Sequence, residues 1–508
     1  MRYLYLLILL VLSLQKIGVA QDSLQGDLDL KYVIETTLKS NPNIKIQEQV
    51  VESSRGSLLT NIGSFDPTLA LDLEFTTAFG PEFDGTNIIN PVTRTTIYTA
   101  ELTKLLNWGG NLTLELEMER ELDSNNFRYA SNTATVLLEL EIPLLQGLGT
   151  NATEGAELAA RYTLAAERKN YIYTLSQQVQ TVVLAYWTYV AAADNYRIQI
   201  ETLDEAEKYY QDNKLLAEND NIPGSNLVSL LATISQNKID LATAEQNLYS
   251  ARQSLGIAMG VNFEEIDRLS MPGTHFPKYE DLPDSSLVMS LQPARLTSIA
   301  LDKRYDYQSS LDKVTSSNYL LKQAENGTLT ELDLTLSSGY SGFIGGNKVS
   351  ALFSPFYKNV DGLNFGITLA YTIPFRNNTA KGNLITASAT YMQNRITSAE
   401  TERQIRSSVA VSLREFQTAY LNFLQGKLTV EYYKRALKDE KEKVKLGTSG
   451  VINVDYLERS LLTAKLSHVK IRQAYANALL NLKFATGTLL DSRGNVNFID
   501  ISNIMNLK

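Results

Sequence analysis

The sequence predicts a mixed, mainly α-helical fold in which long coiled-coil helices and amphipathic strands occur twice in one chain of 508 residues. Three observations lead to this prediction. The chain is similar to itself at two fixed shifts, it contains very long segments with coiled-coil spacing, and shorter segments alternate with a period of two. Such strands, next to such helices, indicate a membrane β-barrel joined to a helical region.

The N-terminus has the pattern of a secretory signal peptide. Arg2 is followed by an apolar run over 3–14, and Gly18-Val19-Ala20 precede Gln21. We expect residues 1–20 to be removed, so that the mature chain begins at Gln21 in the cell envelope.

Charge and cysteine content exclude several classes of partner and site. Removal of Arg2 and Lys16 takes the formal net charge from −9 to −11, which argues against nucleic acid as a partner. The chain has no cysteine, so it has no disulfide, no thiolate metal site and no lipid-bearing cysteine.

Two gapless self-alignments show a tandem duplication. A shift of 227 residues superposes 221–260 on 448–487, and a shift of 263 superposes the region around Leu38 on that around Leu301. The expected organisation is a signal peptide, a first repeat, a proline-containing linker, a second repeat and a polar tail: 1–20, 21–260, 261–287, 288–487 and 488–508.

Each repeat contains one long helical segment without internal proline, over 154–219 and 379–446. Apolar residues in both segments recur at alternating spacings of three and four, as coiled-coil packing requires: Leu175, Val179, Val182, Tyr186, Tyr189, Ala193, Tyr196, Ile200 and Leu203, then Val409, Leu413, Phe416, Tyr420 and Phe423. Shorter helices are predicted in both repeats, at 33–61, 226–259, 294–327 and 454–487.

Between the helices the apolar period changes to two. Leu69, Leu71 and Leu73 alternate with polar residues, as do later segments around 112–118, 136–142, 332–336 and 365–373. A half-buried soluble sheet has the same pattern. The signal peptide, the duplication and the long helices favour strands of a membrane barrel instead, and no run of 18 apolar residues after residue 20 predicts a transmembrane helix.

The order of these elements resembles the TolC outer-membrane efflux protein family over nearly the whole mature chain. Local patterns that carry the resemblance are Asn41-Pro42, Ile142-Pro143-Leu144-Leu145, and the stretch from Gly450 to Gly487 with Val454-Asp455-Tyr456-Leu457-Glu458 near its start. Each pattern is weak alone, and their order and spacing together are specific.

The resemblance implies a homotrimer in the cell outer membrane, with a β-barrel among the lipids and a long periplasmic α-barrel. An inner-membrane pump and a periplasmic adaptor protein would be its partners. The implied function is that of a passive exit duct for small molecules in a tripartite efflux pump. The alternatives are the outlet channel of a type I protein secretion system, a coiled-coil envelope spacer without a pore, and, more remotely, an envelope enzyme.

The number of strands is open at this point. The resemblance implies four strands per chain and twelve in a trimer. Residues 93–122, with strand patterns on both sides of the Asn107-Trp108-Gly109-Gly110 turn, form an additional hairpin in the first repeat, and six strands per chain would make eighteen. We expect twelve, with an elaborated first repeat.

No catalytic, cofactor or metal motif is found. The two histidines, His275 and His468, have no cysteine or histidine neighbours that would make a metal site, and the chain is predicted not to be an enzyme. The resemblance singles out Asp455 and Glu458 as a pore constriction at the periplasmic entrance, where three copies would gather their carboxylates. The alternative is a helix start that favours acids through its dipole.

Overall fold

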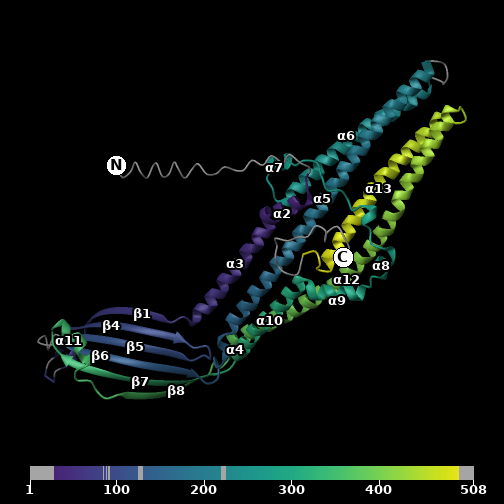
Figure 1. The fold of residues 1–508 in the computed structure, drawn as a ribbon. Coiled ribbons are helices and arrows are strands. Elements are labelled where there is room, and N and C mark those ends of the chain that lie inside the picture. Colours follow the sequence, from purple (N-terminus) through teal and green to yellow (C-terminus); the bar gives the residue numbers. More distant parts are fainter. Residues whose placement is uncertain are drawn as a thin grey trace, which may run out of the picture. The chain divides into compact units, whose positions relative to one another are not determined.

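The computed structural model describes residues 28–83, 85–86, 88–89, 92–123, 130–218 and 225–490 (Figure 1). The predicted signal peptide and residues 491–508 of the predicted tail lie outside this range. The chain divides into two compact units. A helical unit combines the segment up to Gln47 with Tyr171–Tyr305 and the segment from Arg403 onward, and a sheet unit combines Glu48–Asn170 with Asp306–Glu402. Both repeats therefore contribute segments to both units.

The two repeats contain matching helices. In the first, α2 (Leu30–Ser40) and α3 (Pro42–Ile62) precede the strands, and α5 (Gly155–Glu218) and α6 (Ser225–Met259) follow them. In the second, α9 (Pro293–Lys303) and α10 (Tyr305–Asn326) precede the strands, and α12 (Asn378–Lys445) and α13 (Val451–Ala485) follow them. The remaining short helices are α4 (Thr150–Thr153), α7 (Phe263–Asp267), α8 (Ser285–Ser290), α11 (Val349–Phe353), η2 (Gly63–Phe65), η4 (Tyr279–Asp281) and η5 (Ser354–Phe356).

The predicted single helices over 33–61 and 294–327 are each two helices, and this prediction was wrong. Asn41 has an extended backbone after α2, and Pro42, which has no N–H to donate, begins α3. The buried Asn41 side chain donates to the carbonyl oxygen of Ala258 at 2.9 Å and accepts from the backbone N–H of Asn43 at 2.9 Å. Gly260, with a φ of 76°, lies against this break, where a Cβ atom would meet the Cα of Asn41 at 2.7 Å.

The helical unit has its own hydrophobic core, as the predicted seams require. One cluster surrounds Tyr186 and Trp187, whose side chains are almost completely buried, and the Trp187 ring lies 5.4 Å from that of Phe276 in the linker. A second cluster joins Phe416 and Tyr475 across α12 and α13. The linker 261–287 is thus part of this core through Phe276.

The sheet unit contains a six-stranded antiparallel sheet in the order β1-β4-β5-β6-β7-β8 (Figure 1). Its strands are β1 (Thr68–Phe79), β4 (Val92–Leu105), β5 (Asn111–Asp123), β6 (Ser131–Pro143), β7 (Glu331–Gly345) and β8 (Asn364–Thr372). The short β2 (Glu82–Phe83) and β3 (Ile88–Ile89) pair only with each other.

The expectation of four strands per chain is corrected to six. The β4–β5 hairpin lies inside the sheet, between β1 and β6. The apolar residues of β4 and β5 lie on the same face of the sheet as those of β1 and β6. Among the described helices, none combines the length and the apolar character that a bilayer span would require.

Candidate functional site

One face of the six-stranded sheet is apolar from edge to edge. The register aligns Leu71 of β1 with Ala100, Leu116, Val136 and Tyr340 of the next four strands. Leu71 is 73% exposed and Ile367 of β8 is 76% exposed, so none of the described residues covers this face at either edge. A contiguous apolar surface of this size marks contact with another protein or with lipid.

The height of the apolar face suits a bilayer. The side chains from Leu69 to Phe75 in β1 extend over about 20 Å at the usual rise of a strand, close to the band of about 25 Å on outer-membrane barrels. Arg94, Lys104 and Arg120 share this face only toward the ends of their strands. Charges near the margins and apolar residues between them are typical of a lipid-facing sheet.

The opposite face is polar and strongly acidic. Among the strand residues that the structure describes, it has no lysine or arginine. The carboxylates whose register places them on this face are Asp72, Glu74, Glu101, Glu115, Glu117, Glu119, Glu121, Glu139, Glu141, Glu331 and Asp333. This face needs water and counter-cations, whereas the other face needs an apolar environment.

The acidic positions singled out in the sequence, Asp455 and Glu458, lie in the helical unit on α13. This helix begins at Val451, and its first turn has no acidic residue. Both acids lie after that first turn. The helix dipole therefore explains their presence less well than it would at the first residues of the helix.

Both carboxylates have cationic partners within the chain. Asp455 Oδ2 lies 3.1 Å from Arg459 Nε, and Glu458 Oε1 lies 2.6 Å from Lys441 Nζ on α12. The Thr233 hydroxyl on α6 donates to Asp455 Oδ1 at 3.1 Å and accepts from Arg459 Nη2 at 3.0 Å. These contacts tie α13 to both α6 and α12.

Burial and a neighbouring cation act on the pKa of Glu458 in opposite directions. Burial raises the pKa of Glu458 above its ordinary value, although the adjacent Lys441 ammonium acts in the opposite direction. The side chain is only 18% exposed, so the loss of hydration outweighs one partly exposed ion pair. That Asp455 and Glu458 of three copies form a ring stays a prediction.

Lys441, Thr233 and Arg459 were missed in the sequence. The spacing of four residues between Asp455 and Arg459 is a helical ion-pair signal that could have indicated their contact. Lys441 lies six residues before Gly447 and Glu458 lies eight residues after Gly450, so an antiparallel helix pair brings them near each other. No sequence pattern indicates Thr233, because α6 belongs to the other repeat.

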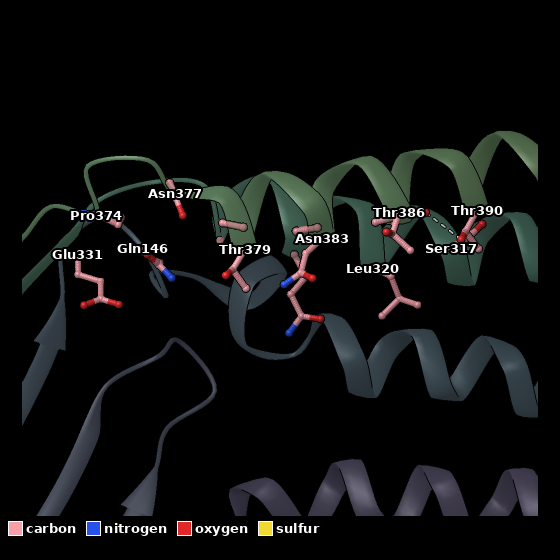
Figure 2. A pocket seen from close by; sticks show the side chains of 15 residues that line it. Gln146, Ser317, Leu320, Glu331, Pro374, Asn377, Thr379, Asn383, Thr386 and Thr390 are labelled. Atoms are coloured by element: carbon pink, nitrogen blue, oxygen red, sulfur yellow. Dashed lines mark hydrogen bonds between the residues drawn. The ribbon is translucent and has the colours of Figure 1, made fainter.

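A groove of about 720 Å³ in the sheet unit is lined mainly by small polar side chains (Figure 2). Thr379, Asn383 and Thr386 face it from α12, and Leu320 faces it from α10. Among the described residues that line it, Glu331 is the only acid, and there is no histidine or lysine. Such a groove offers hydrogen bonds but no acid–base pair for catalysis.

The two histidines lie in different environments. His275 is exposed, and His468 stacks on Phe423 with ring centroids 6.3 Å apart. Burial, followed by the nearby Arg472, Lys427 and Lys434 charges, lowers the pKa of His468. Among the described residues no group of three histidine, aspartate or glutamate side chains is arranged to hold a metal.

The structure thus combines a sheet that has one apolar and one acidic face with long paired helices. Residues 296–488 match the family model described as outer membrane efflux protein. The resemblance predicted from the sequence is therefore confirmed over these residues. No curated protein matches the sequence.

Solved structures extend the similarity of the fold to nearly the whole chain. The Campylobacter jejuni CmeC outer membrane channel is 17% identical with a TM-score of 0.63, over 94% of this chain and 90% of that chain. The Vibrio cholerae outer membrane protein VceC is 15% identical with a TM-score of 0.66, over 90% and 96%. The open state of the Neisseria gonorrhoeae MtrE outer membrane channel is 17% identical with a TM-score of 0.58, over 90% and 88%.

Proposed function

We propose that the chain is one protomer of a homotrimeric channel in the outer membrane, where three sheets join edge to edge into a β-barrel and the helices continue it as a periplasmic tunnel. Its function is that of a passive exit duct for small molecules. A periplasmic adaptor protein and an inner-membrane pump are its partners in a tripartite efflux pump. The observation that carries this proposal is the open six-stranded sheet with its uncovered apolar face.

The edges of the sheet require partners. Among the strands that the structure describes, β1 and β8 each pair with one neighbour, so each leaves a row of backbone N–H and C=O groups without a strand partner. Inside a bilayer every such group must find a partner, which only closure of the sheet provides. The described strands of one chain do not close the sheet. In the proposed trimer, the copies are related by rotation, and β8 of each copy pairs with β1 of the next.

Asp455 and Glu458 are proposed as the constriction at the periplasmic mouth. Three-fold symmetry places each acid of the three copies at one height, and their combined negative potential favours cations. Asp455→Ala with Glu458→Ala is expected to raise conductance or weaken block by multivalent cations, with trimer assembly unchanged. Unchanged conductance, cation preference and block would show that these acids serve only to pack α13.

Single-channel conductance in a planar bilayer tests the proposed function. The purified protein is expected to insert as a long-lived water-filled pore. A control preparation of Ile367→Arg, which puts a charge on the apolar face, should insert far less often. A protein that binds the bilayer without any conductance would identify it as an envelope spacer and contradict the proposal.

The alternative of a type I protein secretion outlet uses the same duct. A deletion strain separates the two functions. Loss of small-molecule tolerance with a normal set of secreted proteins supports efflux, whereas loss of one secreted protein with normal tolerance supports secretion.

A further inference from the structure

We propose that the inserted β4–β5 hairpin gives the assembled channel an eighteen-stranded barrel, wider than the twelve-stranded barrel that four strands per chain would form. This inference rests on the proposed trimer and concerns the bore of its membrane part. It follows from the position of the hairpin in the sheet, from its register and from its length.

The hairpin is an integral part of the wall. Every residue of β1 from Thr68 to Phe79 pairs with β4 and not with β6. β5 takes the other side, where Leu112 pairs with Leu140 and Leu116 with Val136. β1 and β6 therefore have no direct pairing, and the sheet cannot close around a trimer without β4 and β5.

The hairpin also continues both faces of the wall without interruption. Two added strands keep the antiparallel alternation, and the rows across the sheet keep their character, as in Leu73–Tyr98–Met118 on the apolar face. On the other face Asp72 lies in line with Thr99 and Glu117. A hairpin folded outside the wall would have no reason to keep this register.

The length of the hairpin matches that of the wall. β4 has 14 residues and β5 has 13, compared with 12 in β1 and 13 in β6. The turn between β4 and β5 packs closely against the backbone at Gly147. Gly109 has a φ of 105°, and a Cβ atom there would meet the carbonyl oxygen of Gly147 at 2.1 Å.

The strand count determines the bore. With strands about 4.8 Å apart and tilted by about 40°, eighteen strands give a backbone diameter of about 36 Å, against about 24 Å for twelve. Barrels of 16–18 strands leave an aqueous channel in their interior. The acidic face of the sheet would line this channel, so the membrane part would not restrict small cargo by size.

End-on views of the purified full-length trimer by electron microscopy test this inference directly. A ring of about 36 Å at the level of the barrel is expected. A trimer with a ring of about 24 Å would overturn the wider barrel and leave the proposed channel intact. A protein that forms no trimer would contradict the proposed function itself.

A deletion variant provides the matched comparison. Removal of Val92–Asp123 deletes both β4 and β5. The end of β1 and the start of β6, which this deletion brings together in the sequence, lie at the same end of the sheet, because Phe79 pairs with Val92 and Glu121 with Ser131. The ring of this variant should shrink by about a third. An unchanged ring would show that the hairpin is not part of the wall, and a variant that does not assemble leaves the full-length ring as the deciding measurement.

Discussion

The helical unit buries its large apolar side chains within the chain, whereas the sheet unit exposes them. The two tryptophans illustrate the difference: Trp187 on α5 is 1% exposed in a core of aromatic rings, and Trp108 in the β4–β5 turn is 38% exposed. The helical unit is therefore stabilised by its own core. Under the proposed function, lipid covers the apolar face of the sheet unit, and strands of further copies cover its edges.

The largest expected effect is in the core of the helical unit. Trp187→Ala removes the ring that packs against Tyr186 and Phe276, and we expect a loss of about 3–5 kcal/mol in the free energy of unfolding. Denaturant unfolding in detergent, followed by circular dichroism, measures it. Trp108→Ala is the matched control, and an equal loss in both variants would contradict the difference between the units.

The apolar face of the sheet unit is tested next. Ile367→Arg puts a charge toward lipid and should cost about 2–4 kcal/mol, seen as loss of folded, heat-resistant protein in the outer membrane. Thr368→Arg, the neighbour on the acidic face, should be tolerated. If both variants impaired assembly equally, the assignment of the two faces would be wrong.

A smaller effect is expected where α12 and α13 are tied together. Lys441→Met leaves the Glu458 carboxylate without its cation in a largely buried position, which should cost about 1–2 kcal/mol. Lys208→Met breaks an ion pair of the same kind between two exposed side chains and should have no measurable effect. Equal unfolding midpoints for all three proteins would show that burial does not strengthen this contact.

The smallest effect is a histidine-dependent change of stability with pH, which is confined to the helical unit because the sheet unit has no histidine. The pKa of His468 is lower in the folded protein than in the unfolded chain. Its contribution to stability is therefore complete above the ordinary histidine pKa and is lost as pH falls through the lowered value. His468→Gln should reduce the acid-dependent fall of the unfolding midpoint, and an unchanged profile would assign that fall to other groups.

The sequence predicted the helical unit better than the sheet unit. Val409, Leu413, Phe416, Tyr420 and Phe423 are all buried, because a heptad seam directly reports the face that packs. The break between α2 and α3 was missed although Pro42 marks it. The alternation of the strands was correct, but alternation shows the faces of a strand and not which strand is its neighbour.

For the acidic pair Asp455 and Glu458, the local position was likewise predictable, whereas the contacts with distant residues were not. Its place on a helix near the turn was predictable from Gly447, Gly450 and the residues that follow. Its contacts with Lys441 and Thr233 depend on which helices lie side by side, which one sequence without homologues does not show.

Under the proposed function, the chain forms a complete sheet only as a trimer. Native mass spectrometry of the mature protein, released from detergent micelles, tests it most directly. The expected result is one dominant species with three times the mass of the mature chain, which persists at low protein concentration. A stable folded monomer under the same conditions would contradict the account.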